Sequence, residues 1–269
     1  MKQLNITLKH VLILGLCLVM ILFEIVPEWK EIPFTEDKVY NRLISLSIPL
    51  FFGVTAVILI AREFGIQLFK NPKQLWVLLP ALVIALDNLP WLSYFAGNMQ
   101  LIHTQPLHFA LFGTYCALVG FFEEILFRGI FFSVLASIFE QTKKGFLYTY
   151  LISSVAFGVV HLLNVFTSGG AAVLQAGYSI LTGGLFGFVW IKTKNIVFPA
   201  LIHAVYNFCG LLFTVNIGLG TGSVIDVPSG IMMAVISVCI GVVVLYKVWK
   251  YPESEQKELY QRLNVKSKA

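Results

Sequence analysis

The chain has 269 residues, of which 58% are apolar and only 12% are charged, and its mean hydropathy is +0.82. Soluble domains carry roughly 25% charged residues, so this composition excludes an ordinary soluble enzyme and indicates a protein embedded in a bilayer. The formal net charge of +5 does not indicate nucleic-acid binding, because the basic residues form short clusters between apolar runs. We therefore predict a single, continuous membrane domain of the all-α class.

Apolar runs long enough to cross a hydrocarbon core, which takes roughly 20 helical residues, recur along the whole chain. They predict a polytopic protein with about eight transmembrane helices. The first run superficially resembles a signal peptide, but Glu24 and Pro27 follow it with no small-residue cleavage site, so we predict a span. In chain order the runs cover residues 10–26, 43–61, 74–95, 107–139, 146–165, 170–192, 196–214 and 229–248.

The fourth run is too long for one untilted crossing. We expect it to tilt, to kink or to begin with an interfacial segment, and Gly113, Gly120 and Gly129 are the places where a bend is expected.

Lysine and arginine are distributed unevenly between the two sides of these spans. Fifteen of the nineteen lie on one side and three on the other, with Arg128 inside a span. Because these residues accumulate in cytoplasmic loops, we predict that both termini are cytoplasmic. The tail from Pro252 is predicted to form a short polar helix, since Glu253 and Glu255 would stand in its first turn.

Ionisable side chains inside spans are costly and are usually retained for function or for internal pairing. All of them except Asp87 fall in the fourth, fifth and seventh runs. We interpret Asp87, close to Pro90, mainly as a partner for backbone groups near a proline kink. Away from the span ends, the set comprises Asp87, Glu123, Glu124, Arg128, His161 and His203.

The fourth run contains two adjacent carboxylates with different predicted surroundings. Glu124 and Arg128 are four residues apart, so they share one helical face and are predicted to form a buried ion pair. Glu123 is rotated by about 100° from Glu124, so it can point at a different neighbour and stay available for chemistry.

Two further pairs show the same four-residue spacing. Phe157 and His161 share a face of the fifth run, and His203 and Asn207 share a face of the seventh. A carboxylate, an imidazole, and a second imidazole with an amide are the groups needed to activate water and to stabilise an oxyanion. Taken singly, each residue is also explained by helix-to-helix hydrogen bonding, so the functional interpretation depends on their joint occurrence.

These three motifs, EExxxR at 123–128, FxxxH at 157–161 and HxxxN at 203–207, occur in the order found in a known family. The chain resembles the CPBP family of intramembrane proteases, which includes CAAX prenyl proteases and bacteriocin-processing or immunity proteins. The resemblance implies that Glu123 and His161 activate the attacking water. It also implies that His203 and Asn207 stabilise the oxyanion.

The resemblance further implies that Glu124, Arg128 and Phe157 support the site. It makes the substrate a membrane-associated peptide or a lipidated protein and places the chain in a bilayer, with a bacterial plasma membrane expected. No cofactor is favoured, because the chain lacks HExxH; a zinc or other divalent ion, if present, would take Glu123, His161 and His203.

We divide this membrane domain into N-terminal spans at 1–106, a catalytic core at 107–215, and a last span with a polar tail at 216–269. Two alternative functions stay open: a non-catalytic immunity or binding protein, and a proton-coupled transporter, for which the expected repeat symmetry is lacking. One feature fits these spans badly. Counted from the cytoplasmic ends of their runs, Glu123 and His161 lie deeper than His203, which is only seven residues into its run. Either the sixth and seventh runs form a hairpin recessed from the cytoplasmic surface, or these boundaries are wrong.

Overall fold

A computed structural model of the chain describes residues 11, 15, 19, 32–97, 105–139, 141–165, 170–212 and 227–263. The described residues form helices and no strand, which agrees with the predicted all-α class. The elements are α2 (Lys38–Glu63), η1 (Leu75–Val77), α3 (Leu78–Asp87), α4 (Trp91–Phe95), α5 (Pro106–Glu124), η2 (Ile125–Phe131), α6 (Phe132–Ile138), α7 (Lys143–Val160), η3 (His161–Asn164), α9 (Ala171–Thr193), α10 (Val197–Leu211), α11 (Val227–Trp249) and α12 (Glu253–Arg262).

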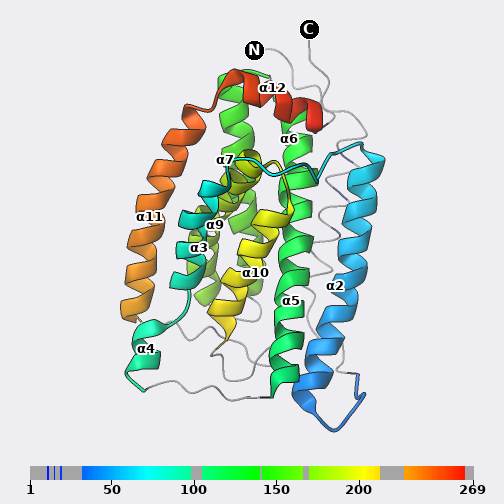
Figure 1. Ribbon diagram of the computed structural model, residues 1–269, viewed down its shortest axis with the longest axis vertical. Helices are drawn as coiled ribbons and strands as arrows, with labels where there is room; N and C mark the ends of the chain where they lie inside the picture. Colours follow the sequence, from blue (N-terminus) through cyan, green and yellow to red (C-terminus); the bar gives the residue numbers. More distant parts are fainter. Residues whose placement is uncertain are drawn as a thin grey trace.

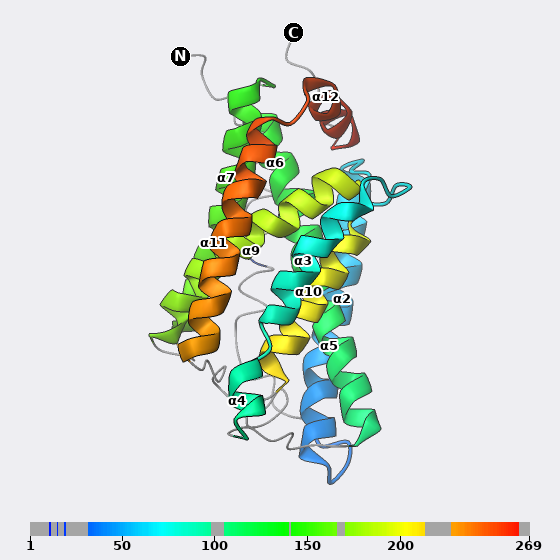
Figure 2. The same cartoon turned by 60° about the vertical axis from the view of Figure 1, so that its left-hand side comes forward.

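The helices form a bundle in which α9 and α10 lie toward the middle and α2, α5, α7 and α11 stand around them (Figures 1 and 2). Over the 18-residue apolar window of each helix, 56% of α9 is buried, against 22% of α2 and of α11. The outer helices instead expose large apolar side chains such as Phe51, Phe52 and Val242. Such a surface is suited to lipid rather than to water, and we describe the chain as an integral membrane protein.

The described residues include four helices that are long and apolar enough to span a membrane, and two shorter apolar helices. The four cover Lys38–Glu63, Lys143–Asn164, Ala172–Thr193 and Ile231–Trp249, and the shorter two cover Leu75–Asp87 and Val197–Leu211. The predicted first span, at 10–26, lies outside the described residues apart from Val11, Gly15 and Val19.

The prediction of one span over residues 74–95 was wrong. The chain leaves the helix after Asp87 and resumes a short helix, α4, only at Trp91. Pro90 explains the break, since a proline disfavours helical backbone at the residue before it and donates no backbone hydrogen bond.

The fourth run forms a long helical segment from Pro106 to Ile138 with a π-helical stretch, η2, in its middle. Gly129 lies in that stretch, so the only irregularity in the segment coincides with one of the three predicted bending points. Gly113 and Gly120 lie within the regular helix α5. π-helical turns are rare and frequently accompany functional residues, and this one contains Arg128.

Gly120 serves close packing. A Cβ added there would lie 2.5 Å from the Ala200 carbonyl oxygen and 3.1 Å from the Ala204 backbone nitrogen, so α5 and α10 approach as closely as their backbones allow. In lipid, apolar side chains gain nothing from leaving the bilayer, so helices associate through small residues that let their backbones approach closely. This contact sets the two glutamates that follow Gly120 beside α10.

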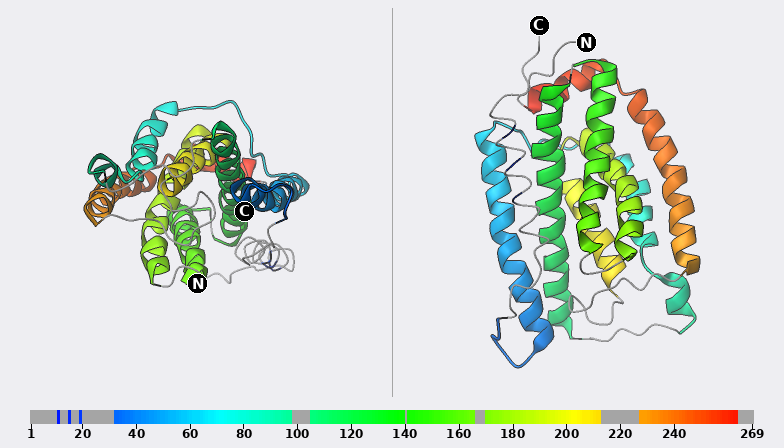
Figure 3. Two further views of the ribbon diagram at one scale, coloured as in Figure 1. Left: turned by 90° about the horizontal axis from the view of Figure 1, so that it is seen from below. Right: turned by 180° about the vertical axis from the view of Figure 1, so that it is seen from behind.

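Helix α12 crosses one end of the bundle (Figure 3). Its carboxylates pair with lysines from two other segments. Glu258 binds Lys70 at 2.9 Å and also Lys194, while Glu255 lies 3.5 Å from Lys192. The predicted polar helix after Pro252 is therefore confirmed, and it ties the α9–α10 turn to the segment that follows α2. The assignment of this end to the cytoplasm remains a prediction.

The turn between α9 and α10 is buried beneath α12. Thr193, Lys194 and Ile196 expose at most 3% of their surface, the Ile196 backbone N–H donates to Leu68 O at 3.0 Å, and Arg262 Nη2 donates to Lys194 O at 2.6 Å. Figure 1 shows α10 beginning well below the upper ends of α6 and α7. The recessed hairpin is thus the correct alternative, and it lowers His203 to the level of the other candidate residues.

Candidate active site

The candidate residues come from three helical segments that meet inside the bundle. Glu123 and Glu124 end α5, Arg128 lies in η2, Phe157 and His161 lie at the junction of α7 with η3, and His203 and Asn207 lie on α10. Within the bundle, α10 packs against α5, and α7 packs against α9.

Glu124 and Arg128 form the buried ion pair that their spacing predicts. Arg128 Nε lies 3.1 Å from Glu124 Oε2, and the two side chains are 1% and 0% exposed. Arg128 Nη2 also donates to Gly183 O at 2.9 Å, and the guanidinium lies 4.2 Å from the centre of the Phe157 ring. Every one of these interactions is internal, so the pair fixes η2 against α7 and α9.

His203 has a carboxylate oxygen near each ring nitrogen. Its Nδ1 lies 3.0 Å from Glu124 Oε1, and its Nε2 lies 3.7 Å from Glu123 Oε2. The ring stacks on Phe186 at 4.9 Å between centroids and meets the edge of Phe157 at 5.7 Å. Glu124 therefore joins Arg128 to His203, a link that the sequence argument did not predict.

His161 is oriented by its own helix. Its Nδ1–H donates to the Phe157 carbonyl oxygen at 2.7 Å, and its ring centre lies 5.0 Å from that of Phe157. A donating Nδ1–H leaves the lone pair of the neutral imidazole on Nε2. The free edge of the ring can thus accept a proton or a hydrogen bond.

Glu123 and Asn207 differ in exposure. Glu123 is 9% exposed, whereas Asn207 is half-buried, one turn after His203 on the same face of α10. An amide at that place can turn toward a group that enters beside His203.

Phe186 and Gly183 contribute to the site without having been predicted from the sequence. Phe186 is 1% exposed and stacks on the His203 ring, and Gly183 supplies a carbonyl to Arg128. Gly183 also lies so close to Phe157 that an added Cβ would come within 2.9 Å of its ring. The adjacent glycines 183 and 184 inside an apolar run were the available sequence signal for close packing at this point.

A metal site was left open by the sequence. Within the described part of the chain, no three His, Cys, Asp or Glu side chains are grouped so that they could hold a metal ion. The His203 nitrogens lie beside the carboxylates, and Glu124 is shared between Arg128 and His203.

Residues 105–209 match the family model described as type II CAAX prenyl endopeptidase Rce1-like. This stretch is similar to Rce1-like domains. The resemblance to intramembrane proteases of the CPBP family is thereby confirmed, and the Rce1-like match indicates a membrane protease, that is, a hydrolase. No curated protein and no solved structure matches the chain. All the candidate residues named above fall inside the matched segment.

Proposed function

We propose that this protein is an intramembrane endopeptidase that hydrolyses a peptide bond in a membrane-associated peptide or a lipidated protein. The observation that carries the proposal is the position of His203, whose two ring nitrogens lie 3.0 Å from Glu124 and 3.7 Å from Glu123. A carboxylate and two imidazoles held together inside a membrane protein form an acid–base site for attack by water.

Glu123 and His161 activate the water in this mechanism. The Glu123 carboxylate accepts a proton as the water oxygen bonds to the carbonyl carbon, and His161 Nε2 accepts a hydrogen bond that orients the water. The proton then passes to the nitrogen of the leaving amine as the carbon–nitrogen bond breaks. A general base of this kind contributes about 10²–10⁴-fold to a rate.

His203 and Asn207 stabilise the negative charge on the carbonyl oxygen. Nδ1–H of His203 donates to Glu124, so a ring that also carries a proton on Nε2 presents that proton to the oxyanion, and the Asn207 amide supplies a second donor. Phe157 and Phe186, both 1% exposed, pack against the His203 ring. A dry, rigid surrounding strengthens such donors, because they need no reorganisation when charge develops.

Glu124 and Arg128 support the site by fixing His203. Arg128 neutralises the buried Glu124 carboxylate, and the other oxygen of that carboxylate fixes the direction of the imidazole. This is the role of the buried carboxylate in an acid–histidine pair, which sets the tautomer and the orientation of the ring. The proposed setting is a bacterial plasma membrane, with residues 107–215 as the catalytic core.

The experiment compares wild type with Glu123→Gln, both purified in detergent to equal folded yield, on a library of lipidated and unlipidated peptides. Glu63→Gln is the matched control, because Glu63 is exposed at the end of α2. We expect cleavage by wild type and the control only, with a rate that a chelator leaves unchanged. Absence of cleavage by all three, where a related peptidase works on the same library, would favour the non-catalytic immunity or binding function.

A further inference from the structure

The break in the predicted third span is a feature that the proposed mechanism does not use. Helix α3 ends at Asp87, Asn88 caps it, and a new helix starts only after Pro90, at Trp91. A helix end leaves groups that a continuous helix would satisfy internally, so these groups can contact a neighbouring element. At this end of α3 the neighbouring element is α10.

Asn88 forms a hydrogen bond with the backbone of α10. Its side-chain amide donates from Nδ2 to the Tyr206 carbonyl oxygen at 2.8 Å. Within a helix that oxygen accepts from the N–H four residues later, and its second lone pair remains for Asn88. From the sequence we expected Asp87 to have such a role, but its Oδ2 has no hydrogen-bond partner within the described ranges. The backbone partner beside Pro90 is therefore Asn88.

The glycine at position 210 makes this hydrogen bond possible. A Cβ added to Gly210 would overlap Nδ2 of Asn88 and lie 3.1 Å from its Cγ. A side chain at this position would therefore push the amide away from the Tyr206 carbonyl. Next to this contact, Leu89 and Cys209 form a small buried cluster, so the chain that follows α3 lies against the second half of α10.

The carbonyl that Asn88 binds belongs to the peptide group of Asn207. A peptide group is planar, and this one contains the Tyr206 oxygen together with the nitrogen and Cα of Asn207. The Asn207 side chain has no hydrogen bond among the described residues, so the backbone of α10 sets where its amide lies. Displacing a group of an active site by about 1 Å can cost about 10²-fold in rate. The bond from Asn88 thus bears directly on the placement of the proposed oxyanion donor.

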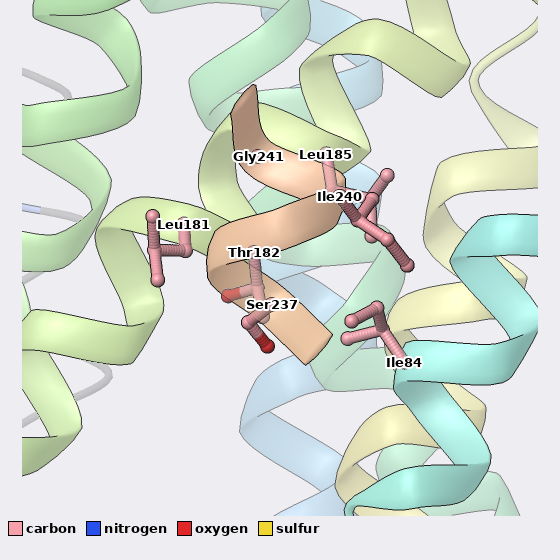
Figure 4. A pocket seen from close by; sticks show the side chains of 7 residues that line it. All are labelled: Ile84, Leu181, Thr182, Leu185, Ser237, Ile240 and Gly241. Carbon is pink, nitrogen blue, oxygen red and sulfur yellow. The ribbon is translucent and has the colours of Figure 1, made fainter. Parts of the chain in front are cut away.

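The other side of α3 is less closely packed. A small pocket lies between α3, α9 and α11 (Figure 4). Ile84 and Ile240 contribute to its aliphatic wall, and Thr182 and Ser237 add hydroxyls. Because α3 packs chiefly against α10 and borders a pocket here, one helical turn before Asn88, its contact with α10 sets the position of its last turn.

We propose that Asn88 is a positioning residue for the oxyanion donor Asn207. Asn88 holds the peptide group that precedes the Asn207 Cα, and Gly210 leaves the space in which Asn88 does so. The Asn207 amide is thereby kept in place one turn after His203. This inference rests on the proposed function, since the oxyanion role of Asn207 belongs to it.

The first test is kinetic and breaks the bond in two independent ways. Asn88→Leu removes the donor, and Gly210→Ala displaces it while leaving Asn88 unchanged. At equal folded yield, each should lower kcat by about 10–10²-fold with little change in KM. Because both act through Asn207, neither should lower the kcat of Asn207→Ala by more than about twofold. Losses that add to that of Asn207→Ala would overturn the proposal in favour of a general effect on the bundle.

Gly177→Ala is the matched control for Gly210→Ala. Gly177 lies on α9, and a Cβ added there meets open space. The control should keep the kcat of the protein in which it is made, both in wild type and in Asn207→Ala. A loss in the control as large as that in Gly210→Ala would show that any alanine in these helices lowers the rate, and it would overturn the role of Gly210.

The second test reads the contact without any activity. The dipeptide Tyr–Asn occurs twice in the sequence, as Tyr40–Asn41 and Tyr206–Asn207. Protein labelled with ¹³C at the tyrosine carbonyl and ¹⁵N in asparagine therefore gives two carbonyl–amide NMR signals in detergent, and Asn207→Ala identifies one of them by removing it. The carbonyl shift responds to the hydrogen bonds that the oxygen accepts.

We expect Asn88→Leu and Gly210→Ala to move the Tyr206–Asn207 signal and to leave the Tyr40–Asn41 signal in place, whereas Gly177→Ala should move neither. A Tyr206–Asn207 signal that stays in place in both variants would overturn the proposal. A moved signal together with no cleavage by wild type would reject the peptidase, and with it the oxyanion role, but would confirm that Asn88 fixes the peptide group of Asn207.

Discussion

Replacing Arg128 by methionine should destabilise the protein more than any other single change at the site. The guanidinium is 1% exposed and neutralises Glu124, which is 0% exposed, so its loss leaves a carboxylate buried with His203 as its remaining partner. Removing one member of a buried pair costs about 3–5 kcal/mol, and we expect the lower end because His203 remains. In a chain of this size, 3 kcal/mol corresponds to a Tm lower by about 6–12 °C.

The assay is thermal unfolding in detergent, followed by circular dichroism, with a double variant that adds Glu124→Gln. The second change removes the unpaired charge, so it should restore most of the stability lost with Arg128. Peptide cleavage should stay lost in the double variant, because His203 no longer has the carboxylate that orients it. A wild-type Tm for Arg128→Met, or activity restored together with stability, would refute this assignment of roles.

Three further predictions concern single side chains elsewhere. Asn207→Ala should lower kcat by about 10²–10³-fold, the usual effect of losing one oxyanion donor, and should leave Tm unchanged. A change in KM alone would count against the role of Asn207 as an oxyanion donor. Gly120→Ala should lower both Tm and activity, because the new Cβ would lie 2.5 Å from a backbone oxygen of α10. Gly113→Ala places its Cβ in open space and should change neither, so equal effects of the two substitutions would exclude the packing role of Gly120. Hydrogen bonds from Lys194 lower the pKa of Glu258 to about 2, so its stabilising effect is complete above pH 4.5 and is lost as the pH falls toward 2. Urea titrations across that range should show a loss in wild type that Glu258→Gln lacks.

The sequence predicted the helical architecture where apolar runs are uninterrupted. The runs that became α2, α7, α9 and α11 were located from hydropathy alone, since a helix in lipid must be apolar over its length. The run at 74–95 failed because hydropathy does not register the backbone effect of Pro90. The α9–α10 turn contacts α12 through Lys194 and Glu258, which are far apart in sequence, and no local pattern predicts that contact.

The contacts of the candidate site were likewise predicted only in part from the sequence. The pairing of Glu124 with Arg128 follows from a four-residue spacing on one helix, so the sequence contained it. The contact of His203 with Glu124 depends on how closely α5 approaches α10. Gly120 permits that close approach, but its presence in the sequence does not predict it. Phe186 was missed because one phenylalanine in an apolar run looks like any other.

The most direct test of the central claim is single-turnover cleavage by Glu123→Gln on a peptide that wild type cleaves. The account predicts no turnover above the uncatalysed background, while Asn207→Ala, assayed beside it at equal folded yield, keeps a slow but measurable rate. A rate for Glu123→Gln of the same order as that of Asn207→Ala would contradict the account, because Glu123 would then not be the base that activates water.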